Sequence, residues 1–420
     1  MYKLHNTIQN YAWGSETALT ELFGIDNNEH LPMAEVWMGA HPKSSSRIIK
    51  KDNLFAPIFS MSSGIVSEDI MSLETLKSYI EKDLVGNLGQ KAADKFKELP
   101  YLFKVLCAKT PLSIQVHPNK KSAELGFEKE NKQGIPLDSP VRDYKDANHK
   151  PELIYALTDF IAMNAFRTLE DISQLILPFK DTHALFSNFI TQPDEKSLSE
   201  LFEGLLKLTG DDKFFLLKQL RHHVNLNISA LDIFNKNHQL TWQTISTILD
   251  IYPEDMGAFS PLLLNVIHLK AGEAMFLYAN TPHAYLSGTG LEIMANSDNV
   301  LRAGLTSKNI NISELMSNLE FIPTALDSLP MKPNKVGIIS HFPIPVDDFR
   351  FSIYHSKIDS KSSINLEGAS IFFCVKGKAR IQANDDEITL LPGQSCFVSM
   401  KTPHIELEGD CVVAQAFYSL

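Results

Sequence analysis

The sequence contains few cysteines, and they form no motif. Four cysteines occur among 420 residues, and no two of them have the CxxC spacing of redox or metal-binding motifs. This scarcity argues against a disulfide framework, so we expect reduced thiols in the core or in strands of a cytoplasmic protein. The four are Cys107, Cys374, Cys396 and Cys411.

The sequence also lacks long apolar runs, a secretion signal and clusters of basic residues. No apolar stretch reaches membrane-spanning length, and Met1–His5 leads directly into polar sequence, so we expect neither a membrane anchor nor a signal peptide. The formal net charge is −11, which makes nucleic acids and anionic membranes poor partners. A small anionic substrate would need a local basic pocket inside this acidic protein.

The order of predicted elements indicates two β-rich blocks separated by helices. The length of 420 residues and the apolar content of 44% are typical of a soluble protein with two or three domains. Helical patterns cover about 67–98 and Thr168 to about Asp250, and the Pro-rich stretch Ile322–Asp348 predicts a connection. Strand-like alternation dominates residues 1–60, 101–118, 151–166, 262–305 and the chain after Asp348.

One segment of the sequence is echoed later in the chain. Residues 272–283 read GEAMFLYANTPH and residues 393–404 read GQSCFVSMKTPH, which agree at five of twelve positions. In both, Gly begins a strand-like alternation and a Thr-Pro-His turn ends it. This pattern is typical of small β-barrels of the cupin kind, in which the histidine points into the barrel. The echo predicts two such barrels, one near each end of the chain.

Polar side chains alternate with apolar ones in the short run Pro111–Pro118. A strand directs alternate side chains to opposite faces, so one face would be apolar and the other would carry a hydroxyl, an amide and an imidazole. Burying three polar groups is costly unless a metal or a polar substrate satisfies them. The apolar face comprises Leu112, Ile114 and Val116, and the polar face comprises Ser113, Gln115 and His117.

Two later segments supply further ligand types. Glu152 enters an apolar strand, and His283 follows Thr-Pro and shares a face with Tyr285. With Gln115 and His117 they form a mixed nitrogen and oxygen set that suits Zn²⁺, or Fe, Co or Mn at lower preference. Two histidines and one carboxylate leave positions open for water or substrate, as a catalytic site requires.

Structural roles are the alternative for each of these residues. An isolated strand histidine is more often a hydrogen-bonded core or surface residue than a ligand, and Glu152 alone could form a structural ion pair with Lys150. Gln115 is an unusual ligand, and His404 of the echo has no Gln-x-His strand before it, so we expect a structural role for His404. We also expect structural roles for His5, His30, His183, His222, His223, His238 and His355.

Two basic residues stand out in the segment Glu292–Lys308, which is otherwise acidic and apolar. Arg302 is suited to bidentate recognition of a phosphate or an oxyanion, and Lys308 offers a point charge. The pair favours a phosphorylated substrate. Ordinary surface positions are the alternative for both residues.

Seven separated motifs together resemble type I mannose-6-phosphate isomerases, most closely the bacterial members of about this length. They are QNYAWGS (9–15), AEVWMGAHPKSSS (34–46), LFKVLCA (102–108), LSIQVHPNK (112–120), NHKPEL (148–153), NTPHAYLSG (280–288) and SDNVLRAGLT (297–306). The resemblance implies a mainly β fold with a helical insertion. It comprises two cupin-like, jelly-roll-type barrels and an α-helical domain inserted in the catalytic barrel.

The resemblance also implies a domain division and an activity. Residues 1–166 and 257–325 would form the catalytic barrel, residues 167–256 the inserted helical domain, and residues 326–420 a C-terminal barrel without a metal site. The implied enzyme interconverts D-mannose 6-phosphate and D-fructose 6-phosphate through a cis-enediol, with one Zn²⁺ per chain, in cytoplasmic mannose metabolism and GDP-mannose biosynthesis. Its partner would be a small sugar phosphate, without nucleic acid or membrane, and the chain would be a monomer or weak dimer.

The family motifs assign roles to particular residues of this sequence. The sequence departs from the family at Ala147 and Ser307, where proline is common, so only the local turns are in question. The implied zinc ligands are Gln115, His117, Glu152 and His283. The implied catalytic residues are Arg302, Glu292 and Lys150. Glu292, Lys150, His149 and a zinc-bound water are candidates for the proton-transfer base, and Glu292 and Lys150 rank first because they match pocket positions of the family. The implied substrate-binding residues are Ser113, Lys308, Tyr285, Lys104 and His149.

Two other functions fit the same scaffold. A cupin with two histidines and one carboxylate also holds Fe(II) and activates O₂ in oxygenases, and a non-catalytic barrel could bind a sugar phosphate as a sensor. Gln115 as a fourth ligand leaves fewer open positions than an oxygenase needs. The pair Arg302 and Lys308 favours a phosphorylated substrate, so the isomerase is the preferred interpretation.

Overall fold

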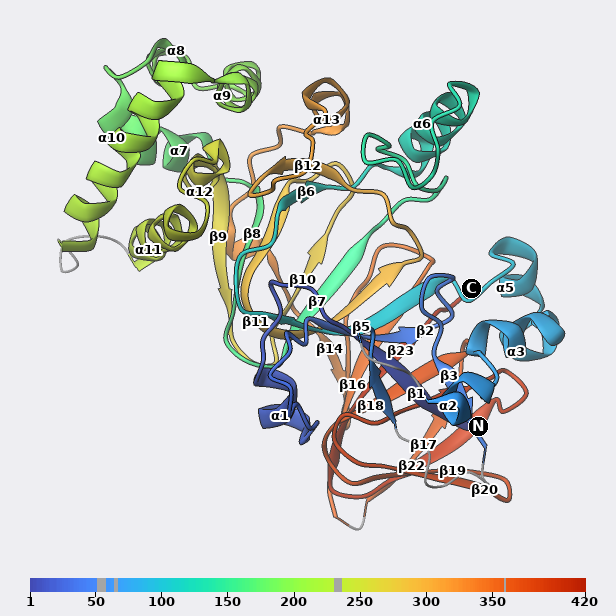
Figure 1. Cartoon of the computed structure of the whole chain (residues 1–420). Coiled ribbons are helices and arrows are strands. Elements are labelled where there is room, and N and C mark those ends of the chain that lie inside the picture. Colours follow the sequence, from blue (N-terminus) through green and yellow to red (C-terminus); the bar gives the residue numbers. More distant parts are fainter. Residues whose placement is uncertain (51–57, 64–66, 230–235, 359) are drawn as a thin grey trace.

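Two β-barrels and a set of helices make up the protein (Figure 1). The structure is a computed structural model, and it describes residues 1–50, 58–63, 67–229, 236–358 and 360–420. Parts of the predicted strand region 1–60 and of the predicted helical region after Thr168 lie outside the described residues. In the described part, no helix is long and apolar enough to cross a membrane.

The first barrel consists of two sheets that share one long strand, β11 (His283–Ala295). The residues of β11 before Gly288 pair with β8 and β6, and those from Gly288 onward pair with β5 and β7. The larger sheet has the order β4 (Phe59–Met61), β1 (Tyr2–Gln9), β2 (Glu35–Gly39), β5 (Tyr101–Ala108), β11, β7 (Glu152–Ala156), β10 (Ala274–Leu277) and β13 (Pro330–Met331). The smaller sheet has the order β9 (Leu264–Leu269), β8 (Phe160–Phe166), β11, β6 (Ile114–Val116) and β12 (Leu301–Gly304).

The second barrel contains the C-terminal strands and part of the first strand of the chain. Tyr2 and Lys3 of β1 pair with β21, so β1 belongs to both barrels. One sheet has the order β3 (Arg47–Ile49), β1, β21 (Ser395–Val398), β18 (Ser370–Gly377), β23 (Cys411–Phe417), β16 (Arg350–Ser356), β15 (Ile339–His341) and β14 (Asn334–Val336). The facing sheet has the order β17 (Lys361–Asn365), β22 (His404–Glu408), β19 (Ala379–Ala383) and β20 (Asp386–Leu390).

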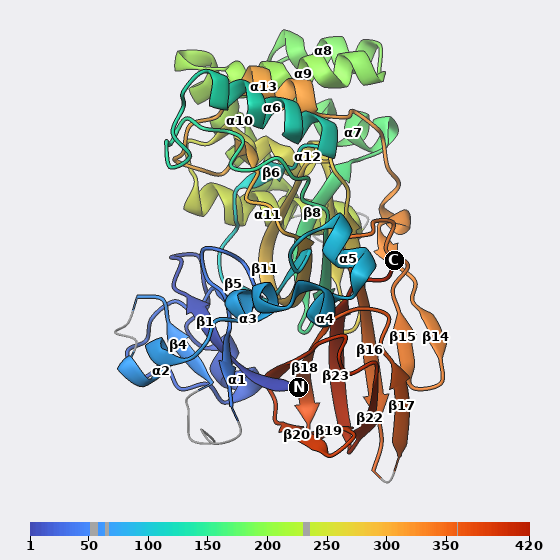
Figure 2. The same cartoon turned by 90° about the vertical axis from the view of Figure 1, so that its right-hand side faces the viewer.

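Helices after Thr168 pack on the smaller sheet of the first barrel, at the opposite end of the molecule from the C-terminal barrel (Figure 2). Several of these helices begin at a capping residue whose side chain accepts a hydrogen bond from a backbone N–H. Thr168 caps α7 in this way, and Asp194 caps α9. The helices are α7 (Leu169–Ile176), η1 (Leu177–Phe179), α8 (Ala184–Thr191), α9 (Glu195–Lys207), α10 (Gly210–Ser229), α11 (Lys236–Ile251), η2 (Met256–Phe259) and α12 (Ser260–Leu263).

The predicted helical region 67–98 forms four short helices, and among the described residues four α-helices lie outside the predicted helical regions. The four of region 67–98 are α2 (Glu68–Ser72), α3 (Leu76–Lys82), α4 (Leu84–Leu88) and α5 (Gln90–Lys95). The unpredicted ones are α1 (Ala18–Phe23), α6 (Lys120–Lys132), α12 and α13 (Ile312–Asn318). The prediction of a mere connection over Ile322–Asp348 was wrong, because that stretch contains β13, β14, β15 and η3 (Leu326–Ser328). The three strands have only two or three residues each, too few for an alternating pattern to show; β14 and β15 form a local hairpin, and β13 pairs with the distant β10.

The hydrophobic core is continuous between the two barrels. One cluster joins Phe103 and Leu291 of the first barrel to Phe351, Phe373 and Phe397 of the second. A second cluster joins the helices to the smaller sheet, and a third lies inside the C-terminal barrel. All four cysteines are buried and free, as predicted. The predicted fold class, mainly β with two cupin-like barrels and a helical insertion, is confirmed.

Candidate metal centre and active site

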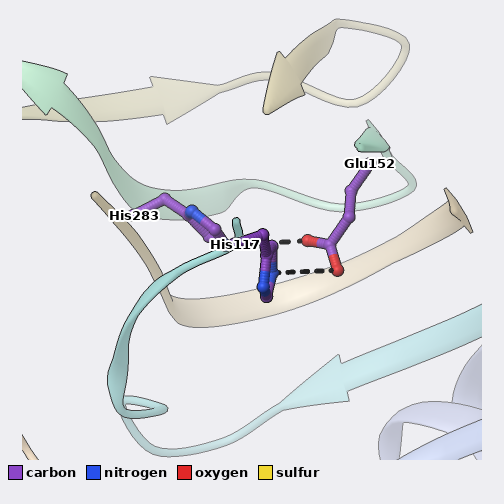
Figure 3. Close-up of side chains that lie close together, drawn as sticks. All are labelled: His117, Glu152 and His283. Carbon is purple, nitrogen blue, oxygen red and sulfur yellow. Dashed lines mark ion pairs between the residues drawn. The ribbon is translucent and has the colours of Figure 1, made fainter. Parts of the chain in front are cut away.

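Three predicted ligands converge inside the first barrel. One ligand atom each of His117, Glu152 and His283 lies within 4.8 Å of the others, and all three side chains are buried. Figure 3 shows both imidazoles beside the carboxylate. The Nε2 atoms of His117 and His283 lie 3.4 and 3.6 Å from the two carboxylate oxygens of Glu152. β6, β7 and β11 therefore bring residues that are distant in sequence to one point.

The hydrogen bonds of the two histidines decide which nitrogen faces Glu152. Nδ1 of His117 lies 2.8 Å from the backbone oxygen of Asn299, and Nδ1 of His283 lies 3.1 Å from that of Thr281. A carbonyl oxygen only accepts, so each Nδ1 carries the proton. Burial lowers the pKa of His117, and it lowers the pKa of His283 to about 4, so both rings are neutral. Each Nε2 therefore presents a lone pair.

This arrangement fits a cation. Two Nε2 lone pairs and the carboxylate of Glu152 are all electron-pair donors, and Nε2 of His117 is buried without a hydrogen-bond partner among the described residues. Such a group is costly unless something with positive charge satisfies it. The carbonyls of Asn299 and Thr281 hold the rings in the orientation that a metal needs, as is usual for metal-binding histidines.

Gln115 and Arg302 lie beside this cluster in the smaller sheet. In the register of the strands, Gln115 of β6 is opposite His283 of β11 on one side and opposite Arg302 of β12 on the other. Burial supports the predicted strand parity within β6, where Ile114 and Val116 are in the core and Gln115 is half-buried. Leu112 precedes the strand and lines the cavity beside Ser113, so the parity predicted for Leu112 does not hold. The amide of Gln115 is therefore next to the histidine pair.

Buried ion pairs surround the three candidate ligands. Nζ of Lys150 lies 3.0 Å from Glu152, and Nζ of Lys104 lies 2.9 Å from Glu292 and 3.6 Å from Glu35. Although burial alone would raise it, Lys150 and the histidines hold the pKa of Glu152 well below its usual range. Burial raises the pKa of Glu292 despite Lys104. The structural ion pair considered for Glu152 thus exists alongside the cluster of ligands.

A large cavity of about 1170 Å³ opens beside these residues. Gln115 and Lys150 line it, which places the metal centre at its edge. The lining contains more cations than acids, so a basic pocket exists inside an acidic protein, as an anionic substrate requires. The lining cations are Lys43, Lys104, Lys145, Lys150, Lys213, Arg302 and Lys308, and the lining acids are Glu35, Glu254, Asp255 and Asp298.

Arg302, Lys308 and Ser113 line the same cavity. The proximity of Arg302, followed by burial, lowers the pKa of Lys308. Burial also lowers the pKa of Arg302. Two neighbouring cations of this kind are suited to a divalent anion such as a phosphate.

Comparisons with known proteins agree on one family. A model of the phosphomannose isomerase type I catalytic domain matches residues 1–169, and a model of the mannose-6-phosphate isomerase cupin domain matches residues 338–418. Mannose-6-phosphate isomerase of Escherichia coli (strain K12) is 49% identical, and the match covers 100% of both chains. The chain belongs to the type I phosphomannose isomerase family. The predicted family and the predicted enzyme class, an isomerase, are confirmed.

Solved structures of type I phosphomannose isomerases share the whole architecture. A crystal structure of a mutant phosphomannose isomerase from Salmonella typhimurium has a TM-score of 0.90 at 47% identity, with 100% of both chains covered. A crystal structure of mannose 6-phosphate isomerase bound with zinc and yttrium has a TM-score of 0.89 at 47% identity, again over 100% of both chains. The fold described above is therefore that of the isomerase family.

The structure brings together most residues that the sequence assigned to the site of this isomerase. Tyr285 and Glu292 are buried, and burial and the nearby carboxylates of Glu292 and Glu152 raise the pKa of Tyr285. His149 lies elsewhere: its Nε2 is 3.1 Å from Asp348, and it lines a separate cavity of about 690 Å³. Its role in substrate binding stays a prediction that no contact in the main cavity supports.

Several cavity residues were missed by sequence reasoning. Lys43 and Asp298 lie in two of the quoted motifs but received no role, although they form an ion pair of 2.8 Å at the cavity. Lys145 precedes the NHKPEL motif and lies in a region without periodicity. Lys213 and Asp255 come from the helical insertion, and nothing in its amphipathic pattern indicates that one end of it reaches the active-site cavity.

Proposed function

We propose that this isomerase interconverts D-mannose 6-phosphate and D-fructose 6-phosphate at a site that holds one zinc ion. The observation that carries the proposal is the set of buried electron-pair donors His117, Glu152 and His283 at the edge of a cationic cavity. Relatives named for this activity match the chain over its full length, and one neighbouring structure is bound with zinc. These observations support a metal-dependent enzyme that acts on an anionic sugar.

The donor set favours zinc. Two imidazole nitrogens and one carboxylate, with the amide oxygen of Gln115 beside them, form the mixed nitrogen and oxygen environment that zinc accepts. When bound, zinc would act as a Lewis acid on the sugar oxygens or on a bound water. The protein's part is to hold the ligands still, which the carbonyls of Asn299 and Thr281 do by fixing both imidazole rings.

Phosphate binding would orient the substrate. In this proposal Lys308 and Ser113 grip the phosphate, and Arg302 assists them or stabilises negative charge that develops on the sugar. Binding energy from the phosphate, which does not react, is then used to place the reacting carbons next to the catalytic groups. The lining of the cavity by all three residues supports this assignment.

The isomerisation moves a proton between C2 and C1 through a cis-enediol, so a base must remove and return it. Lys150 and Glu292 are the candidates. Lys150 lines the cavity and its Nζ is held 3.0 Å from Glu152. Glu292 is buried and bonded to Lys104, which lines the cavity, and burial raises its pKa toward the range in which a carboxylate exchanges protons near neutral pH.

We also propose the division into a catalytic barrel (residues 1–166 and 257–325), an inserted helical domain (167–256) and a C-terminal barrel (326–420). The helices α7–α11 support the inserted domain. β1 is an exception to the division, because it is assigned to the catalytic barrel but pairs with strands of both barrels. A monomer or weak dimer stays a prediction, which size-exclusion chromatography with light scattering checks.

Metal analysis combined with a coupled isomerase assay tests the proposed function. We expect turnover of mannose 6-phosphate under nitrogen, loss of turnover on chelation, and recovery on addition of zinc. Full activity in metal-free protein would contradict the metal site. Turnover that needs O₂ would instead favour an oxygenase, and tight binding of fructose 6-phosphate without turnover would favour a sensor.

A further inference from the structure

The loop that carries Lys308 is fastened to the helical insertion by one carboxylate. Oδ2 of Asp255 accepts a hydrogen bond of 3.1 Å from the backbone N–H of Thr306, and Oδ1 accepts one of 2.7 Å from that of Gly257. Asp255 thus caps η2 at the end of the insertion and binds the loop after β12 at the same time. The backbone N–H of Lys308 donates to Oγ1 of Thr306 at 3.1 Å, which extends the connection to Lys308.

The loop also packs closely against Asp255 and the start of η2. Gly304 has a φ of +136°, and a Cβ there would lie 2.9 Å from Cα of Gly257 and 3.2 Å from Oδ1 of Asp255. Leu305, which follows, has a φ of +54° and is buried. A non-glycine residue adopts this left-handed backbone only when its surroundings enforce it. The surroundings include Gly257, because a Cβ on that residue would lie 3.1 Å from the N atom of Leu305.

The loop has to be held, because it places two cations next to each other. Arg302 and Lys308 line the same cavity, and the proximity of Arg302 lowers the pKa of Lys308. Like charges separate unless a restraint or a bound anion opposes their repulsion. Among the described contacts, the hydrogen bond from the backbone N–H of Thr306 to Asp255 ties this loop to the insertion, and the bond from Gly257 to the same carboxylate fixes Asp255 at the start of η2.

We propose that Asp255 is a positioning residue that holds the segment Leu305–Lys308 so that Lys308 and Arg302 face one anion. The inference rests on the proposed function, because it takes that anion to be the phosphate of the sugar substrate. It gives the helical insertion a task in the reaction: the insertion anchors the phosphate-binding side of the cavity, while the barrel supplies the metal ligands.

Steady-state kinetics of Asp255→Ala and Asp255→Asn test the inference. We expect KM for mannose 6-phosphate and the inhibition constant of inorganic phosphate to rise together by about tenfold in D255A, since the loop loses the hydrogen bond that Thr306 donates to a carboxylate. We expect kcat to change much less, because the zinc ligands and Lys150 are untouched. D255N keeps one acceptor oxygen, so a rise of about threefold is expected, and this variant carries the test if D255A does not fold.

A matched control separates positioning from stability. Asp194 caps α9 in the same insertion, accepts the backbone N–H of Ser197 at 2.7 Å, and does not line the cavity. Asp194→Ala should lower the melting temperature about as much as D255A without changing KM or phosphate inhibition. An equal rise of KM in both variants would overturn the inference.

The double variant with Lys308→Ala adds a readout that a merely structural role would not change. If Asp255 acts through Lys308, D255A should raise KM far less in the K308A background than in the parent protein. Fully additive effects, or unchanged phosphate inhibition in D255A, would overturn the inference while the parent enzyme still turns over mannose 6-phosphate. A parent protein without turnover would contradict the proposed function instead.

Discussion

At the scale of single residues, chemistry and strand parity predict candidate site residues, and the structure brings His117, Glu152 and His283 together. Gln115 and His117 alternate with core residues in one short strand, and this parity alone indicates two polar groups aimed at one space. Their partners Glu152 and His283 are recognisable as ligand types, but the residues give no distance between them. The structure supplies the distance, and the carbonyls of Asn299 and Thr281 supply the orientation of the rings.

The echo between the two Thr-Pro-His turns offers a sharp test of the metal centre. His283 is buried beside Glu152, whereas His404 is exposed and bonds to the side chain of Asn365. We expect His283→Gln to reduce bound zinc from about one ion per chain to a small fraction, because a catalytic site has few ligands to lose. His404→Gln should keep full zinc content. Metal analysis after dialysis measures both, and equal zinc content in the two variants would contradict the site.

His41 predicts a pH dependence of stability. Burial lowers its pKa from 6.5 to about 4, although Asp298 lies 3.7 Å away. Below pH 6.5 the unfolded chain therefore binds a proton at His41 more readily than the folded protein does. As the pH falls from 6.5 toward 4, the free energy of unfolding decreases. Between pH 7 and pH 5 the free energy of unfolding should fall by about 2 kcal/mol more in the parent than in His41→Gln.

Urea unfolding of the metal-free proteins at both pH values measures this difference, and removal of the metal keeps zinc loss out of the comparison. Parallel pH dependences in parent and variant would show that His41 does not carry the effect.

At the scale of elements, one strand decides the shape of the site. β11 begins with His283, turns at Gly288 from the smaller to the larger sheet, and continues through Glu292. Gly288 has a φ of +115°, and a Cβ there would lie 2.4 Å from the backbone oxygen of Asp159. The sequence shows that position 288 is a glycine, but only the packing of β8 against β11 shows that no side chain fits at this position.

Gly288→Ala should therefore destabilise the protein by about 2–4 kcal/mol, because strain and a backbone clash add. Gly337 is the matched control: its φ is +59°, yet no described residue other than its own chain neighbours has an atom within 4 Å of the place where an alanine methyl group would sit. Gly337→Ala should cost only about 1 kcal/mol, the penalty of the left-handed backbone alone. Urea unfolding compares the two, and equal losses would contradict the packing argument.

At the scale of the whole molecule, the two barrels behave as one folding unit. The C-terminal barrel has an apolar cluster of its own, but Phe351, Phe373 and Phe397 of its strands belong to the cluster that contains Phe103 of the first barrel, and β1 pairs in both barrels. The hydroxyl of Tyr101 in β5 reaches the backbone oxygens of Ala416 and Ala369 at 2.8 and 3.1 Å, and so joins the barrels by hydrogen bonds. We infer that the barrels unfold together.

Tyr101→Phe tests this coupling. The variant loses the hydrogen bond that the buried hydroxyl donates to the C-terminal strands, so we expect the free energy of unfolding to fall by about 1–2 kcal/mol in a single transition. The three tryptophans, Trp13, Trp37 and Trp242, lie outside the C-terminal strands, whereas far-UV circular dichroism reports on both barrels. Coincident midpoints from the two probes are expected in both proteins, and separated midpoints would contradict one unit. The exposed Tyr278→Phe serves as control and should change little.

The sequence by itself determined the donor types, the strand parity around Gln115, the basic pair Arg302 and Lys308, and the family. These are local properties, because the period of a strand and the chemistry of a side chain do not depend on distant contacts. Only the tertiary structure decided that Glu152 and His283 meet His117, that His149 lies in another cavity, and that Asp255 of the helical insertion holds the loop of Lys308. Those outcomes depend on which strands pair across the barrel and where the insertion packs, and long-range contacts of this kind leave no periodic trace in the chain.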